Sequence, residues 1–238
     1  MMKKTSLSLR NLFCIAALVS ALGLTACDSL LDLPELEVSI SGSISHSNYT
    51  PGQSGTVTFN RFPASVNEFK HVQELIGGEP HGAVALELMA AEMYRRNASR
   101  GRECFRLCNV PTNVNTQIDR WRELFSKDVY YARPYQVAAF LKGATQANNY
   151  TPKEPYEIEV KVNGGRPYEE NNQTYHATVL FLDVISHGHD AGSQTVYVVK
   201  PNACHAYPSG SRFFVVDHCP GLYTQVKEIY EPGWNKLK

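Results

Sequence analysis

The hydrophobic period of the chain changes near Gly143, and this change limits the possible folds more than any other feature. Over residues 65–142, apolar residues recur at the three- and four-residue spacing of helices. After it they alternate with polar residues, as Ile158, Val160 and Val162 do, which is typical of half-buried strands. Helices followed by a run of strands predict an α+β fold with an antiparallel sheet rather than a βαβ repeat.

The helical half is predicted to hold four helices. A capping box at Ser65 and Glu68 begins the first one. Residues 81–98 are rich in Ala, Leu, Met and Glu and apolar on more than one face, so they predict a buried central helix. The other two are expected to begin at Asn115 or Thr116 and, for a short helix over 134–143, at Pro134.

Strands are expected on both sides of the helices. Residues 38–44 and 56–59 predict an N-terminal β-hairpin around a turn at 48–52. Later strand-like runs are 158–162, 174–185, 195–199, 213–216 and 223–229, with Asn163-Gly164-Gly165 and Ser209-Gly210 in the intervening loops. Residues 37–238 are therefore expected to form a single domain with an N-terminal β-hairpin, a helical middle and a C-terminal antiparallel sheet.

The first 26 residues have the organisation of a signal peptide. Three basic residues and no acidic one accompany a short apolar stretch over residues 12–22. That stretch is too short to span a bilayer but fits the apolar region of an export signal. We therefore expect an exported protein.

The apolar stretch leads into Leu24-Thr25-Ala26-Cys27, which resembles the lipobox of bacterial lipoprotein precursors. The resemblance implies that residues 1–26 are removed and that Cys27 is acylated, with residues 27–36 as a tether. It implies a protein of the cell envelope, anchored by lipid to the periplasmic or surface side of a bacterial membrane. The alternative is an ordinary secretory peptide that contains a cysteine by chance.

Two further segments resemble a family of uncharacterised bacterial proteins of unknown function. One comprises Val57–Phe59 and Phe62–Phe69, and the other is the connector Gly143-Ala-Thr145…Asn149-Tyr-Thr-Pro152…Pro155-Tyr156. The resemblance would cover residues 55–230. It implies a helical half, the connector and a β-rich half, but no activity, and the sequence departs from the family pattern after about residue 187.

Four cysteines remain after Cys27: Cys104, Cys108, Cys204 and Cys219. In an exported protein such cysteines favour disulfides over free thiols. Cys204 and Cys219 are expected to pair across a hairpin. Cys104 and Cys108 would then bridge locally, which requires the helix to end before them, or stay reduced.

Two groupings could instead hold a metal ion. The first combines the four cysteines with the adjacent His205 and His218 in a zinc site. Structural zinc sites usually have a closely spaced ligand pair at both ends, and here only Cys104 and Cys108 form such a pair. The second is His187-Gly-His189-Asp190, where His187 and His189 would share one face of a strand. Because this run lies between two predicted strands, we favour a solvated turn.

Five arginines fall within the twelve residues 95–106, at the predicted end of the central helix and in the loop after it. They are Arg95, Arg96, Arg100, Arg102 and Arg106. Arginine suits the recognition of phosphate, sulfate, carboxylated sugars and lipid headgroups, so this is the candidate anion-binding patch. The alternative is that the arginines complement the helix dipole and are solvated.

The overall charge argues against a nucleic-acid partner, since 23 basic residues balance 23 acidic ones. The sequence has no Gly-x-Ser-x-Gly elbow and no phosphate-binding glycine loop, so we assign no catalytic residue and expect no cofactor. The expected function is non-enzymatic binding of an anionic ligand or an envelope protein by a lipid-anchored module. The alternative is a metal-dependent envelope hydrolase.

Overall fold

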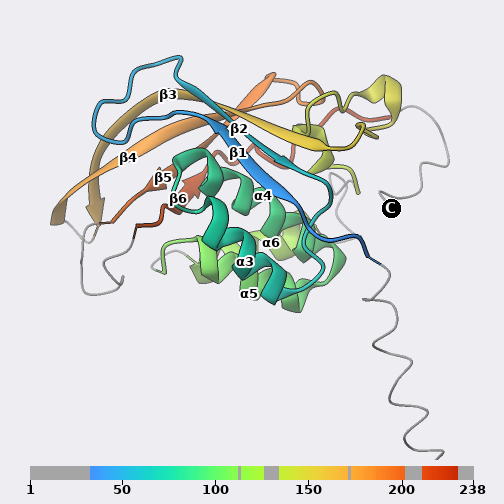
Figure 1. The fold of residues 1–238 in the computed structure, drawn as a ribbon, viewed down its shortest axis with the longest axis horizontal. Helices are drawn as coiled ribbons and strands as arrows, with labels where there is room; N and C mark the ends of the chain where they lie inside the picture. Colours follow the sequence, from blue (N-terminus) through green and yellow to red (C-terminus); the bar gives the residue numbers. More distant parts are fainter. Residues whose placement is uncertain (1–32, 112–113, 126–133, 171–172, 202–210, 230–238) are drawn as a thin grey trace, which may run out of the picture. The chain divides into compact units, whose positions relative to one another are not determined.

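The computed structural model describes residues 33–111, 114–125, 134–170, 173–201 and 211–229. Leu36–Lys238 form one compact unit. In its described part, a layer of four helices covers one face of a six-stranded antiparallel sheet (Figure 1). This confirms the predicted α+β fold. Cys27 and Cys204 lie outside the described residues.

The strands lie in the sheet in the order of the sequence, and each pairs antiparallel with the next. They are β1 (Val38–Gly42), β2 (Ser54–Phe59), β3 (Tyr156–Glu170), β4 (Gln173–Ile185), β5 (Ser193–Val199) and β6 (Phe214–His218). The predicted N-terminal hairpin is present, but it is part of the main sheet, because β2 pairs with β3 and Phe59 lies opposite Tyr156. All the helices are therefore inserted between two adjacent strands.

The four helices are α3 (Val66–Ile76), α4 (Pro80–Arg96), α5 (Ala98–Cys108) and α6 (Val114–Leu124). The predicted Ser65 cap begins α3, since its side chain accepts a hydrogen bond from the Glu68 N–H, but the Glu68 carboxylate accepts from the Ala64 N–H and not from Ser65, so the capping box is incomplete. Helix α4 is the predicted central helix, and its side chains are buried from Pro80 to Tyr94. Asn97 ends α4 and caps α5 through its side chain. A second helix therefore follows where a loop was expected.

Two expected elements are absent from the described residues. In place of the helix expected over 134–143 there is a short 3₁₀ turn, Ala138–Phe140, and Val137 to Leu141 are all buried. The strand expected over 223–229 is reduced to an isolated bridge between Val226 and His189.

The Gly164-Gly165 pair lies inside β3 and not in a turn. The register between β3 and β4 shifts between Val162 and Gly164, so Asn163 is the extra residue of a bulge directly before the two glycines. A Cβ on Gly165 would lie 2.8 Å from Tyr49 Cζ, which explains why this position takes glycine. β3 therefore continues to Glu170, past the short strand predicted over 158–162 and the loop expected after it.

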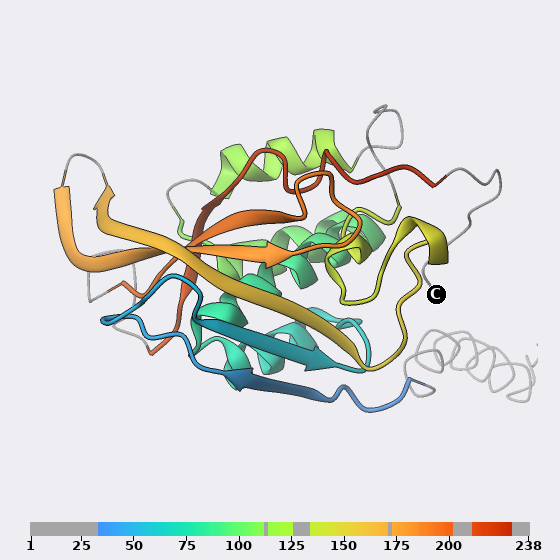
Figure 2. The same cartoon turned by 90° about the horizontal axis from the view of Figure 1, so that it is seen from above.

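The connector, residues 143–156, lies at the end of the sheet where β1 begins, opposite the tip of the β3–β4 hairpin (Figure 2). It contains a second 3₁₀ turn, Gln146–Asn148, and leads directly into β3. Within the described residues, no helix is long and apolar enough to cross a membrane.

Candidate functional site

The first two arginines of the predicted anion patch are bound to a buried carboxylate. Arg95 donates to both carboxylate oxygens of Glu92 at 2.8 and 2.6 Å, and Arg96 Nε donates to Glu92 Oε1 at 2.7 Å. The Glu92 side chain is fully buried. A buried carboxylate is costly unless it is paired, so these two arginines offset that cost. The Arg96 guanidinium also lies 5.4 Å from the ring centroid of Phe62.

The other three arginines of the patch lie on α5. Arg100 donates to the carbonyl oxygen of Ala64 at 3.2 Å, and the Arg102 guanidinium lies 5.9 Å from the ring centroid of Tyr94. Arg106 is exposed. Four of the five arginines thus have protein partners, which favours a structural role for the cluster.

Cys104 and Cys108 are buried free thiols in the structure. A local bridge required the helix to end before them, but α5 continues to Cys108, so the expectation of that bridge is wrong. Burial raises the pKa of Cys104 to about 12 and that of Cys108 well above its ordinary value. Neither thiol is therefore a reactive nucleophile. Cys219 forms no disulfide with another described cysteine, and because Cys204 lies outside the described residues, the pairing of Cys204 with Cys219 stays a prediction.

The two histidines of the candidate metal site His187-Gly-His189-Asp190 lie in different environments. His187 is exposed, whereas His189 is buried. Both ring nitrogens of His189 are used by the backbone: Nε2 lies 2.9 Å from Gly221 O, and Nδ1 accepts from the Ala191 N–H at 3.1 Å. The run lies in the connection between β4 and β5, where a turn was expected, but the turn is not fully solvated because His189 is buried. The described residues contain no group of three or more His, Cys, Asp or Glu side chains suited to a metal ion.

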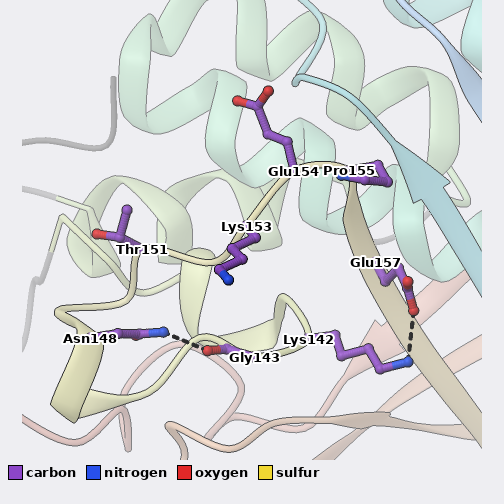
Figure 3. Close-up of a pocket in the computed structure, with 8 residues that line it drawn as sticks. All are labelled: Lys142, Gly143, Asn148, Thr151, Lys153, Glu154, Pro155 and Glu157. Atoms are coloured by element: carbon purple, nitrogen blue, oxygen red, sulfur yellow. Dashed lines mark hydrogen bonds and ion pairs between the residues drawn. The ribbon is translucent and has the colours of Figure 1, made fainter.

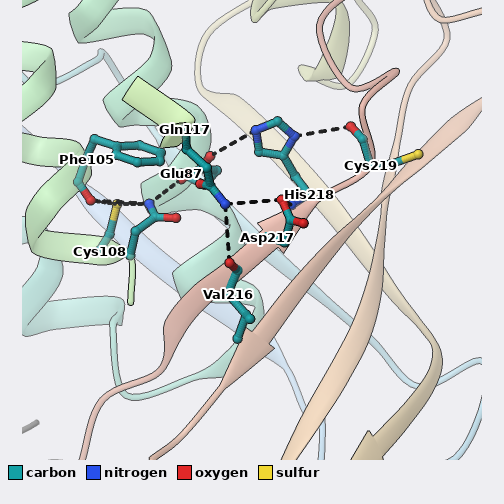
Figure 4. Close-up of polar contacts among 9 residues, drawn as sticks. Glu87, Phe105, Cys108, Gln117, Val216, Asp217, His218 and Cys219 are labelled. Carbon is teal, nitrogen blue, oxygen red and sulfur yellow. Dashed lines mark hydrogen bonds and ion pairs between the residues drawn. The ribbon is translucent and has the colours of Figure 1, made fainter. Parts of the chain in front are cut away.

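A polar cluster that the sequence did not indicate lies in the core between α4, α5 and β6 (Figure 4). Its centre is Glu87, which is fully buried on α4. Asn109 Nδ2 donates to Glu87 Oε2 at 2.7 Å, and His218 Nε2 lies 3.9 Å from Glu87 Oε1. Burial raises the pKa of Glu87 to about 8 and lowers the pKa of His218 below its ordinary value.

These contacts define where the protons lie in the cluster. His218 Nδ1 lies 3.1 Å from the carbonyl oxygen of Cys219, so Nδ1 carries the proton and Nε2 is a bare acceptor. Glu87 Oε1 faces this acceptor at 3.9 Å, which is beyond hydrogen-bond distance, and neither atom has a hydrogen-bond partner among the described residues. At neutral pH the pair is therefore an uncharged acid beside an uncharged imidazole, which is why it tolerates complete burial.

An open pocket of about 530 Å³ lies on the connector (Figure 3). Its lining comprises Lys142, Gly143, Asn148, Thr151, Lys153, Glu154, Pro155 and Glu157. Most of these residues precede β3, so the connector supplies both the floor and the rim of the pocket. We call this hollow the connector pocket.

The two lysines of the connector pocket differ in their partners. Lys142 Nζ forms ion pairs with Glu157 at 2.8 Å and Glu159 at 2.9 Å, and these carboxylates raise the pKa of the lysine. Lys153 is exposed and forms no ion pair with any other described residue. In Figure 3 its side chain points towards Gly143 and Lys142. The connector pocket therefore contains one cation whose charge is not compensated.

The backbone that shapes the connector pocket is held in an unusual conformation. Asn149 and Tyr150 both have positive φ, 53° and 52°, which is costly for residues other than glycine. Burial of Tyr150 offsets this cost: its hydroxyl donates to Lys227 O at 2.7 Å, and its ring stacks on Tyr135 at a centroid distance of 4.6 Å. The sequence singled out this segment as a connector, but its prolines suggested only an extended chain and not a pocket.

Comparison with known proteins identifies the family of the chain and no function. A family model described as "Domain of unknown function (DUF6935)" matches residues 61–230, more than half of the chain. No curated protein and no solved structure matches the chain. The expectation of an uncharacterised family is thus confirmed, and the chain belongs to the DUF6935 family of unknown function.

Proposed function

We propose that this chain is a lipid-anchored protein of the bacterial cell envelope that binds a small anionic ligand in the connector pocket without catalysing a reaction. The single observation that carries the binding proposal is the Lys153 ammonium, which is uncompensated by any described residue and points into an open pocket of about 530 Å³. The anchor proposal is supported by the sequence Leu24-Thr25-Ala26-Cys27.

The chemistry of the connector pocket favours a carboxylated sugar. A lysine ammonium binds a carboxylate as a point charge, whereas the arginine fork suits planar two-point contacts. Around Lys153 the lining is polar and uncharged at Asn148 and Thr151, and negative at Glu154. Hydroxyl groups can pair with these side chains, and one carboxylate can pair with Lys153.

Replacing Lys153 with glutamine is expected to weaken binding of a carboxylated sugar at least tenfold, because the substitution removes the one uncompensated cation. Glucuronate and N-acetylneuraminate serve as probes, with glucose as the neutral comparison, and titration calorimetry measures the affinity. The control is Lys161→Gln, which removes an exposed lysine from β3 outside the pocket lining and should leave binding unchanged. Equal binding by both variants would contradict the proposed site.

Replacing Cys27 with alanine is expected to abolish acylation, because the proposed modification needs that thiol. Metabolic labelling with a radioactive fatty acid measures the loss, and the precursor should keep its N-terminal segment. The control is Cys219→Ala, which removes a partly exposed thiol of the folded domain and should leave labelling intact. Label that persists on the Cys27 variant would refute the lipobox interpretation.

A further inference from the structure

A second hollow adjoins the connector pocket at the β1 side of the sheet. It has a volume of about 220 Å³, and its lining includes Ser39 of β1, Thr58 of β2 and Pro155. Pro155 also lines the connector pocket, so the two hollows meet at this residue. In Figure 3, Pro155 lies just before β3, on the side of the connector pocket away from Asn148 and Thr151. We call the second hollow the edge hollow.

The strand register joins the two hollows across one face of the sheet. Ser39 lies opposite Thr58, and Thr58 lies opposite Glu157 of β3, which lines the connector pocket. Their sequence neighbours Val57 and Ile158 are fully buried in the core under the helices. Because side chains alternate along a strand, Thr58 and Glu157 point to the opposite face of the sheet. A polar row therefore leads from the edge hollow to the connector pocket.

The chemistry of the edge hollow suits a neutral sugar. None of the described residues that line it is basic, and Glu37 supplies a negative charge, so a second carboxylate is disfavoured there. The hydroxyl groups of Ser39 and Thr58 can donate to sugar hydroxyls and accept from them. Pro155 adds an apolar ring on which the C–H face of a sugar can pack. The volume equals that of about seven water molecules, which leaves room for one sugar ring.

We propose that the connector pocket and the edge hollow together bind a glycan of at least two units. Its carboxylated sugar pairs with Lys153, and the neighbouring neutral sugar lies over Ser39 and Thr58. This inference rests on the proposed binding of a carboxylated sugar in the connector pocket. The two hollows differ in charge but meet at Pro155. The ligand that fits both therefore carries a carboxylate on one unit and only uncharged groups on the next.

Titration calorimetry with one monosaccharide and two disaccharides tests for the second unit. The monosaccharide is glucuronate, and in the disaccharides glucuronate is joined to glucose or to N-acetylglucosamine. At least one disaccharide is expected to bind the wild type about tenfold more tightly than glucuronate does, because it adds hydrogen bonds in the edge hollow.

Paired substitutions in two neighbouring rows of the sheet locate this gain in affinity. The variant Ser39→Ala/Thr58→Val removes both hydroxyl groups from the edge hollow, so it should lose the gain and bind glucuronate as the wild type does. The matched control Ser41→Ala/Thr56→Val makes the same changes on the same two strands, at residues that also lie opposite each other. Neither of its residues lines either hollow, so the control should keep the gain. Valine suits a strand as well as threonine does, so both melting temperatures should stay close to that of the wild type.

The outcomes separate this inference from the proposed function. Equal affinity of the wild type for glucuronate and both disaccharides would overturn the inference and leave the connector pocket as a site for one acidic sugar. Equal behaviour of the two double variants would place the second sugar elsewhere and overturn it as well. A wild type that binds none of the three probes would contradict the proposed function, and this inference with it.

Discussion

Replacing Gly101 with alanine is expected to lower the free energy of unfolding by about 3 kcal/mol or more. Alanine in a helix is ordinarily more favourable than glycine by about 1 kcal/mol, so the expected sign is the reverse of the usual one. Gly101 is buried on α5, and a Cβ there would lie 2.1 Å from Tyr94 Cα and 2.3 Å from Tyr94 N. Both atoms belong to the backbone of α4, so no change of rotamer relieves the clash.

Urea unfolding followed by circular dichroism measures this effect as a lower midpoint. The control is Gly164→Ala in β3, where the added Cβ would lie 3.5 Å from Phe181 Cδ2, an ordinary contact. That variant should stay within about 0.5 kcal/mol of the wild type. A Gly101 variant as stable as the control would mean that α4 and α5 do not cross closely at this glycine.

The stability of the protein is expected to fall by about 2 kcal/mol between pH 6.5 and 8, because of Glu87. Burial raises the pKa of Glu87 from its ordinary value of 4.5 to about 8, so the folded state holds a proton that the unfolded state releases. That stabilisation is complete below pH 4.5 and is lost as the pH rises through about 8. His218 acts on the acid side only, since its lowered pKa costs stability as the pH falls below 6.5.

Replacing Glu87 with glutamine should remove the decline above pH 4.5, so the variant is expected to match the wild type near pH 4.5 and to be more stable than it by about 2 kcal/mol near pH 6. The glutamine amide can donate to His218 Nε2, and its oxygen can accept from Asn109, so the contacts of the protonated acid are kept. Thermal melts from pH 5 to 9 measure the slope. The control is Glu74→Gln, at an exposed position of α3. A Glu87 variant that keeps the wild-type slope would show that Glu87 is ionised in the folded protein.

Local chemistry was enough to predict most elements of the fold. The side chain of Ser65 caps the start of α3, as expected. The alternation of apolar and polar residues predicted the ends of β4 and β5 to within two residues. Such features depend on neighbours in the sequence, so they can be read from it. The family match over residues 61–230 confirmed the expectation of an uncharacterised family.

Other features depended on contacts between distant segments. Four helices separate β2 from β3, so no local pattern indicated that Phe59 pairs with Tyr156 and joins the N-terminal hairpin to the sheet. The glycines at 164 and 165 suggested a turn, but both pair with β4 directly after a bulge, and only the packing of Tyr49 shows why Gly165 has no room for a side chain.

The candidate sites were decided by tertiary structure for the same reason. The arginine cluster looked like a ligand patch because its charges are adjacent in sequence, whereas the buried Glu92 that binds Arg95 and Arg96 is visible only in the fold. Glu87 looked like one more polar residue of a helix. The sequence by itself determined most helices and strands and their order. Burial came only from the packing of the whole chain, and it sets both the energetic cost of a charged group and the space around a lysine.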